Sequence, residues 1–222
     1  IGPVHEYLEV GGNIIPSNIA VTHRKMDKTE IAESDRNLKI YENRLRNGEN
    51  FTPRDLYYYA NELKDHSKFQ NAIIFYEEFL ATRRGWVEDE IRACIYMADC
   101  YRELGDERKE KETLVKSLIY DVPRPEVSCR IGDIYKGQNE LKKEIIWYRL
   151  AIEKDLDSHE GFRLEAYSTW YPHLQLCFCY WQLGELIKAV EHNNKAKEYR
   201  PNDDRVLYNE NFFKEYFSNQ QT

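Results

Sequence analysis

The sequence predicts an all-α protein in which helix-turn-helix repeats stack into a solenoid, behind a short β-like N-terminal segment. Similar patterns of large and small apolar residues recur about 34 residues apart, which is typical of helical repeat arrays. Glycine and proline are scarce, at 10 and 7 of 222 residues, and the strongest turn signals fall between the expected helices. Aromatic residues make up 14% of the chain and recur at helical spacing, where large rings fill the groove between paired helices.

The clearest repeat covers residues 171–201, and its two helices are separated by a turn at Leu183-Gly184. Two further repeats, at about 91–124 and 125–158, are offset by 34 residues, and a weaker one covers about 53–86. The pattern is carried, in these four repeats, by Tyr171, Leu174, Cys177, Tyr180, Ala189, Ala196 and Pro201; by Cys94, Met97, Ala98, Tyr101, Leu114 and Ser117; by Ser128, Ile131, Gly132, Tyr135, Tyr148 and Ala151; and by Leu56, Ala60, Leu63, Ala72, Tyr76 and Phe79. The period and the order of large and small residues resemble those of tetratricopeptide (TPR) repeats.

The repeats are unevenly spaced. About four extra residues separate the first two, near residues 84–87, and about eleven separate the last two, at roughly 157–170. Insertions in repeat proteins form loops that often lie on a binding face, although a longer helix or a neutral loop would fit equally well. A final helix over 204–217, with an aspartate at its N-cap after Pro201-Asn202-Asp203, is expected to cap the array.

Composition excludes several classes of protein. The net charge of −7 does not favour nucleic-acid binding, which needs a basic face. No run approaches the roughly 18 apolar residues of a membrane span. Five cysteines without a CxxC pair favour buried, reduced thiols over a zinc site, and therefore a cytoplasmic protein.

The first fifty residues depart from the repeat pattern. Residues 1–28 alternate weakly around the turn signal Gly11-Gly12-Asn13 and are expected to form a strand-loop-strand remnant of another domain. Residues 29–50 are expected to contain a linking helix over 30–47, ended by Asn47-Gly48, and residues 51–222 form the repeat domain. Because the chain does not begin with Met, we expect it to be a piece of a longer protein.

Several strings resemble a known family. They are Val4-His5-Glu6-Tyr7-Leu8, Ile19-Ala20-Val21-Thr22-His23, Arg36-Asn37-Leu38-Lys39-Ile40-Tyr41-Glu42, Leu56-Tyr57-Tyr58-Tyr59-Ala60-Asn61-Glu62-Leu63, Gly85-Trp86-Val87-Glu88-Asp89 and Tyr120-Asp121-Val122-Pro123-Arg124. Together they resemble bacterial family 2 glycosyltransferases that carry a C-terminal TPR extension. The resemblance implies a parent enzyme of GT-A fold that uses a nucleotide-sugar donor with Mg or Mn. The DxD motif that holds donor and metal in that family has no counterpart here, so this segment is expected to bind no cofactor tightly and to be inactive alone.

The same resemblance suggests roles for N-terminal residues. His5 and Glu6 would belong to the catalytic site, and His23 resembles the histidine that closes the metal site after the last strand. Imidazole and carboxylate groups suit that chemistry because both ligate hard or borderline cations. The alternative is that all three are polar residues on a hairpin surface.

Other candidates lie within the repeats. Trp86 with Glu88 and Asp89 could hold a sugar or peptide, although two acids are also typical of the first turn of a helix. Asn61 and His159 are further candidates for binding an acceptor or partner, and Arg92 and Arg130 are basic residues of a kind that lines TPR grooves. The run Tyr57-Tyr58-Tyr59 and the residues Trp147, Trp170 and Trp181 are assigned to packing.

These observations support two functions. In the first, the chain is the acceptor-binding or scaffold region of a nucleotide-sugar-dependent glycosyltransferase, and the acceptor is a protein, peptide or glycan. In the alternative, it is a free-standing TPR adaptor that binds a peptide or protein in its concave groove. Self-association through exposed repeat faces is compatible with either.

Overall fold

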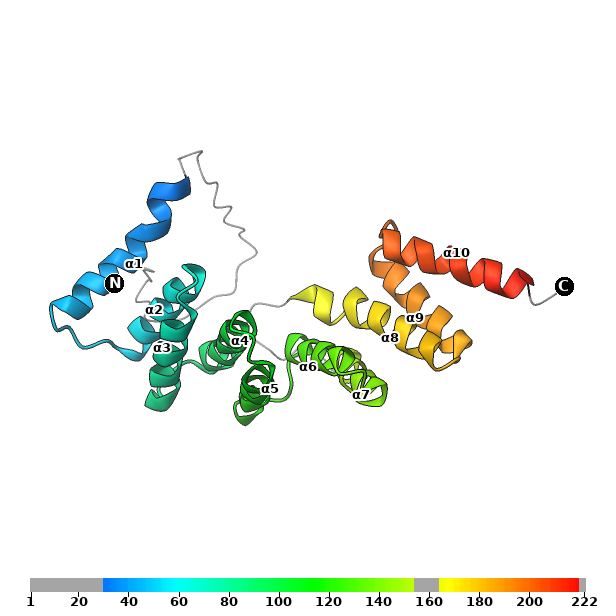
Figure 1. The fold of residues 1–222 in the computed structure, drawn as a ribbon. Helices are drawn as coiled ribbons and strands as arrows, with labels where there is room; N and C mark the ends of the chain where they lie inside the picture. Colours follow the sequence, from blue (N-terminus) through cyan, green and yellow to red (C-terminus); the bar gives the residue numbers. More distant parts are fainter. Residues whose placement is uncertain (1–29, 154–163, 220–222) are drawn as a thin grey trace, which may run out of the picture. The chain divides into compact units, whose positions relative to one another are not determined.

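The computed structural model describes residues 30–153 and 164–219, and the elements in these ranges are helical (Figure 1). The prediction of an all-α, TPR-like repeat protein is confirmed for this part of the chain. The expected β-like segment, residues 1–28, lies outside the described residues, and the division at residues 28 and 50 stays a prediction. The elements are α1 (Glu30–Arg46), α2 (Pro53–Asp65), α3 (Phe69–Thr82), α4 (Val87–Glu103), α5 (Glu107–Lys116), η1 (Ser117–Ile119), α6 (Pro125–Gly137), α7 (Leu141–Ile152), η2 (Glu165–Tyr167), α8 (Trp170–Gln182), α9 (Leu186–Tyr199) and α10 (Asp204–Asn219).

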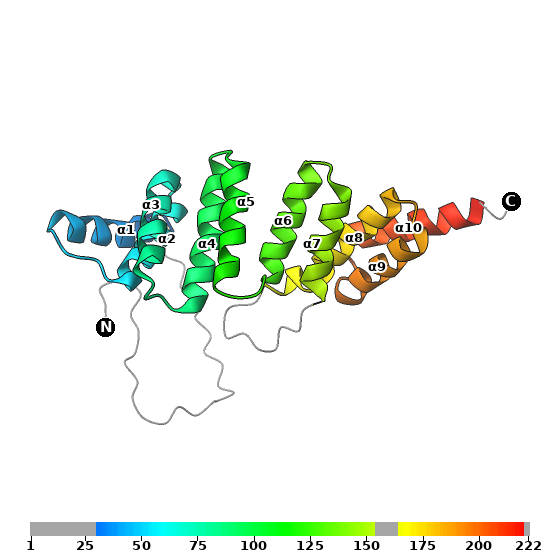
Figure 2. The ribbon, with the colours of Figure 1, turned by 90° about the horizontal axis from the view of Figure 1, so that it is seen from below.

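Helices α2–α3, α4–α5, α6–α7 and α8–α9 form four helical hairpins, each corresponding to one predicted repeat. Figure 2 shows α4–α5 and α6–α7 as successive hairpins of the same form. Helix starts follow local rules: Thr52 and Asp55 form a reciprocal capping box at α2, and Pro53 and Pro125 occupy the first turns of α2 and α6. The Asp203 side chain accepts the Arg205 N–H at 3.0 Å, as expected for the capping aspartate of α10.

One turn recurs inside all four hairpins. A residue with positive φ follows the first helix: Ser67 (57°), Gly105 (75°), Asn139 (58°) and Gly184 (73°). In each case the next backbone N–H donates to the carbonyl five residues earlier, at 2.8–2.9 Å, which is the hydrogen bond of a Schellman motif. The turns are 38, 34 and 45 residues apart along the chain, so the predicted insertions of about four and eleven residues are confirmed.

This register corrects one alignment made from the sequence. A small residue lies seven positions before each turn residue, namely Ala60, Ala98, Gly132 and Cys177. Ser128 and Ile131 lie four positions and one position before Gly132. The equivalent residues before Cys177 in the last repeat are His173 and Leu176. The alignment that gives those positions to Tyr171 and Leu174 is therefore two residues out of register.

The chain divides into two compact units, residues 1–89 and 90–222. In the first, α1, α2 and α3 pack through aromatic rings: Tyr41 lies 5.4 Å from Tyr59, and Tyr57 lies 5.2 Å from Phe79, measured between ring centroids. Both Tyr57 and Tyr59 are buried, which confirms their assignment to packing. An ion pair between Arg44 and Asp55, at 2.6 Å, joins α1 to α2.

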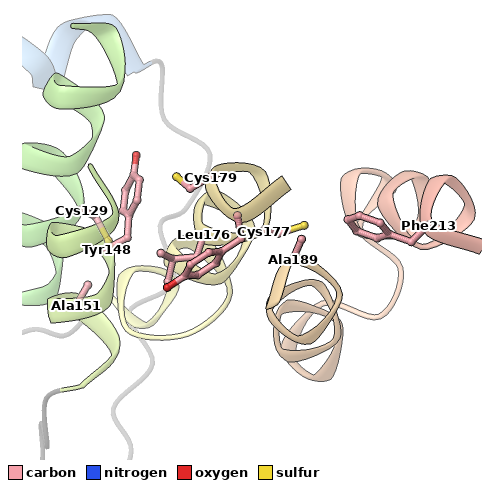
Figure 3. Packing of buried hydrophobic residues seen from close by; sticks show 9 residues of the cluster. Cys129, Tyr148, Ala151, Leu176, Cys177, Cys179, Ala189 and Phe213 are labelled. Atoms are coloured by element: carbon pink, nitrogen blue, oxygen red, sulfur yellow. The ribbon is translucent and has the colours of Figure 1, made fainter. Parts of the chain in front are cut away.

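In the second unit, the core runs through all the hairpins. A cluster of buried residues from α6, α7, α8, α9 and α10 includes Cys129, Tyr148, Leu176, Ala189 and Phe213 (Figure 3). A second cluster joins α4, α5 and α6. The five cysteines of the chain lie in α4, α6 and α8, and all are free and buried, in agreement with the prediction of structural thiols.

Candidate functional site

Of the site residues proposed from the sequence, Asn61, Trp86, Glu88 and Asp89 lie in the described part of the chain. His5, Glu6, His23 and His159 lie outside the described residues. Trp86 is 52% exposed just before α4, whereas Glu88 and Asp89 lie in the first turn of that helix, as their helical interpretation predicted.

Asn61 lies on α2, where its side-chain oxygen accepts the Tyr76 hydroxyl at 2.7 Å. The same bond recurs in the α6–α7 repeat, where the Tyr148 hydroxyl donates to Asp133 at 2.6 Å. In both repeats the tyrosine is 15 residues beyond its acceptor and fully buried. Position 61 therefore belongs to a structural pairing that links the two helices of a repeat.

Asp133 extends this pairing to the next repeat. Its Oδ1 also accepts the Tyr171 hydroxyl of α8 at 2.7 Å. Burial, together with the hydrogen bond to Asp133 and its negative charge, raises the pKa of both tyrosines well above the ordinary value. Both hydroxyls therefore remain donors at neutral pH and hold α6, α7 and α8 together.

Arg130 of α6 contacts both helices of the preceding hairpin in a similar way. Its guanidinium contacts Asp99 of α4 and Glu110 of α5, each at 2.7 Å, and donates to the Ile95 carbonyl at 3.2 Å. Arg130 and Glu110 are both buried. The sequence singled out Arg130 as a basic groove residue, but the structure gives its charge two carboxylate partners within the protein.

A pocket of about 390 Å³ opens beside this network. Its lining mixes both signs of charge and comes from α4, α5, α6 and the turn between the first two: Arg102, Gly105, Glu107, Glu110, Arg130, Asp133 and Ile134. Because both guanidinium groups face carboxylates, the pocket has no strong preference for either an anion or a cation.

Beyond Asp133 the surface changes from charged to aromatic. Phe178 and Trp181 of α8 are 41% and 42% exposed, and their ring centroids are 5.8 Å apart. Phe212 of α10 lies 6.1 Å from Trp181, and Tyr216 lies 6.2 Å from Phe212. We call these four residues the aromatic patch. Trp181 was assigned to packing in the core or between repeats; it contacts Phe212 of α10, but its 42% exposure places it outside the core.

Lys136 of α6 borders the aromatic patch. Its Nζ lies 5.2 Å from the centroid of the Phe178 ring and 2.8 Å from Gln175 Oε1. The contacts Asp99–Arg130, Asp133–Tyr171, Lys136–Gln175 and Trp181–Phe212 therefore form a continuous series of side chains from α4 through α6 and α8 to α10. We call this series the first-helix face, since α4, α6 and α8 are the first helices of their repeats.

Sequence reasoning missed most of this face. Asp133, Lys136 and Phe178 were not singled out, and the repeat pattern gives no signal for surface positions. One signal was available in the sequence. Glu110 and Glu144 occupy equivalent positions in the two middle repeats, 34 residues apart. The same position in the two outer repeats holds a small residue, Ala72 or Ala189. The structure buries both acids, with Glu110 on Arg130 and Glu144 accepting the Cys179 thiol at 3.1 Å.

The described residues contain no group of three or more metal-ligating side chains. Burial raises the pKa of Cys94 to about 11 and that of Cys177 to about 12, so these thiols are poor nucleophiles at neutral pH. Within the same described ranges, no helix has the length and apolarity that a membrane crossing requires.

Comparison with known proteins supports the same fold. Residues 125–157, which include the α6–α7 repeat, match the family model described as tetratricopeptide repeat. A search of curated proteins gives no significant match.

Solved TPR structures resemble this chain at low sequence identity. The chain is 16% identical to YrrB, described as a TPR protein with an unusual peptide-binding site, with a TM-score of 0.57 over 84% of this chain and 86% of that one. MamA from Desulfovibrio magneticus RS-1 is 18% identical, with a TM-score of 0.56 over 78% of this chain and 89% of that one. BtubC from P. vanneervenii is 16% identical, with a TM-score of 0.57 over 78% of this chain and 76% of that one. These likenesses establish a TPR-like fold.

Proposed function

We propose that this chain is a TPR adaptor that binds a peptide or protein segment along its first-helix face. The observation that carries the proposal is the continuity of that face, which ends in aromatic rings that are more than 40% exposed on α8. Tryptophan, tyrosine and phenylalanine are enriched at interfaces, since they bury large areas for little loss of side-chain freedom. The peptide-binding site named in the YrrB structure is consistent with this use of the fold.

A photo-crosslinking experiment tests the proposal. A photoreactive phenylalanine analogue at position 178 is expected to capture discrete partner proteins from a cell extract. The matched control is the same analogue at Ile187 of α9, which is 74% exposed and lies outside the first-helix face. Equal capture at both positions, or none at position 178, would rule out this face as the binding site.

The glycosyltransferase hypothesis is a second, weaker proposal. It is supported by the sequence strings that resemble that family, of which those within residues 1–29 lie outside the described structure. The match to the tetratricopeptide repeat model and the likeness to solved TPR structures favour the adaptor. Finding a nucleotide-binding domain with a DxD motif encoded in the same open reading frame would support the glycosyltransferase; an open reading frame without one would leave the adaptor.

We also propose a reducing compartment, such as the cytoplasm, for this protein. Five buried free thiols support it, because disulfides persist mainly in oxidising compartments. Fractionation of the source cells, followed by thiol counting in the native protein, tests this point. Recovery in an oxidising compartment would contradict it.

A further inference from the structure

We infer that the aromatic patch and Lys136 together select a peptide segment in which an acidic side chain neighbours a bulky apolar one. This inference rests on the proposed function and adds the chemistry of the partner. It follows from two features of the same surface: aromatic rings left open to solvent, and a cation that forms no salt bridge with a carboxylate of the described residues.

The aromatic rings supply the apolar half of the site. Phe178 and Trp181 lie at a tilt of 34°, and Phe212 meets the Trp181 ring edge to face at 85°. Rings from α8 and α10 thus meet at an angle instead of forming one flat surface. An apolar side chain placed against both would bury more surface than on either helix alone, and such burial drives most protein association.

Lys136 supplies the charged half. The ammonium contacts the neutral Gln175 amide and the Phe178 ring, and it forms no salt bridge in the described part of the chain. The charge of the buried Glu144 interacts with it without such a contact. Several lysines of the second unit, in contrast, form salt bridges with acids: Lys143 with Glu140, Lys188 with Glu185, and Lys197 and Lys214 with Glu210. A partner carboxylate could therefore meet Lys136 without displacing an internal ion pair.

The surrounding groups favour this pairing over a basic partner. Two carboxylates of the neighbouring helices are already engaged: Asp133 of α6 accepts two tyrosine hydroxyls, and Glu144 of α7 is buried against Cys179. A lysine or arginine on the partner would instead meet the Lys136 charge. Charge complementarity thus assigns the acid to the partner and the cation to this chain.

A selection from a displayed library of random 12-residue peptides tests the inference on the full chain. We expect the wild-type chain to enrich peptides with Asp or Glu within three residues of Phe, Leu, Ile or Trp. Lys136→Glu is expected to replace the acid in the enriched peptides by Lys or Arg while keeping the apolar residue. Trp181→Ala is expected to abolish the enrichment. Lys142→Glu on α7 and Ile187→Ala on α9 are matched controls that should enrich the wild-type set, and helix content by circular dichroism checks the folding of every variant.

A synthetic copy of the most enriched peptide gives the quantitative test. Replacing its acid by Lys should weaken binding to the wild-type chain at least tenfold, and Lys136→Glu should recover that loss. Enriched peptides without an acid, or an enrichment unaffected by Lys136→Glu, would overturn the inference but leave the proposed function standing. No enrichment by the wild-type chain over an uncoated surface would overturn both.

Discussion

Asp133 is the residue on which three helices converge. Its carboxyl group accepts hydroxyls from Tyr148 of α7 and Tyr171 of α8, and Gly132 beside it lets the Tyr148 ring approach closely. A Cβ at position 132 would lie 2.7 Å from the Tyr148 ring, too close for any other residue without movement of the ring. The Gly132-Asp133 pair therefore fixes both the position and the hydrogen bond of one buried tyrosine.

We predict that Tyr148→Phe lowers the free energy of unfolding by about 1.5–3 kcal/mol, because the lost bond is to a carboxylate. Tyr76→Phe is the matched control, since its acceptor is the neutral Asn61 amide, and it should cost about 0.5–1.5 kcal/mol. Urea unfolding of both variants measures the difference. A loss at Tyr76 as large as that at Tyr148 would contradict the importance of the Asp133 contact.

A second prediction concerns the pair His173 and His192, whose Nδ1 atoms are 2.8 Å apart. Burial and the neighbouring imidazole lower the pKa of His192 to about 4, and burial lowers that of His173. The pKa of His192 is lower in the folded chain than its value of 6.5 in the unfolded chain, so protonation at low pH favours unfolding. The resulting stabilisation of the folded state is complete above pH 6.5 and is lost as the pH falls towards 4. We expect the wild-type chain to lose about 1–2 kcal/mol between pH 7 and pH 5 from this source.

Urea unfolding at both pH values, with His192→Gln for comparison, checks this dependence. The variant should lose less stability than the wild type over the same interval. A pH dependence unchanged by the substitution would assign the effect to other groups.

At the scale of the elements, the inner turn determines the form of each hairpin. Its positive φ favours glycine, yet Ser67 and Asn139 occupy it in two of the four repeats. The backbone hydrogen bonds are the same in all four, so the turn geometry is imposed by the packing of the two helices as well as by the residue.

We predict that Gly184→Ala, at φ 73°, lowers the free energy of unfolding by about 1 kcal/mol. Gly137→Ala, at the end of α6 and with open space around its added Cβ, should raise it by about 0.5–1 kcal/mol. Urea midpoints of the two variants should therefore move in opposite directions. A shift of the same sign for both would contradict the role given to the turn conformation.

The elements themselves could be predicted well from the sequence. The period, the insertion lengths and the capping aspartate of α10 all follow from local signals, which is why the sequence predicts them correctly. The two-residue error at Tyr171 and Leu174 arises because α8 carries apolar or aromatic side chains at many adjacent positions, so several registers fit a pattern of large residues. Only the turn at Gly184 fixes the register.

At the scale of the whole molecule, buried polar contacts join successive repeats of the second unit. Arg130 connects α4, α5 and α6, and Asp133 connects α6, α7 and α8. In a repeat protein each repeat is stabilised mainly by its neighbours, so these contacts couple the stability of adjacent repeats along the array.

We predict that Arg130→Ala lowers the free energy of unfolding by about 3–5 kcal/mol, because it leaves Glu110 buried without its cation. It should also lower the slope of the urea transition as neighbouring repeats uncouple. Arg149→Ala, which removes an exposed pair with Glu153, is the control and should cost under about 1 kcal/mol. An equal cost for the two substitutions would rule out Arg130 as a link between repeats.

The candidate site was less predictable than the fold. Which surface residues meet across repeats depends on the packing of helices that are far apart in the chain, as for Asp133 with Tyr171 and Lys136 with Gln175. The repeat pattern defines buried positions and leaves such pairs unspecified. For the same reason the sequence left open whether Trp181 lies in the core or between repeats, since a tryptophan on an apolar helix fits both positions.

The distribution of cysteines has a practical consequence. Cys94 and Cys100 lie in α4, Cys129 in α6, and Cys177 and Cys179 in α8, so three consecutive hairpins of the second unit each contain a buried thiol. A buried thiol reacts with an alkylating reagent only when its hairpin opens, so the rate at which each peptide gains mass measures local opening. The native chain thus contains its own set of reporters, which could follow fraying and partner-induced tightening hairpin by hairpin without any engineered label.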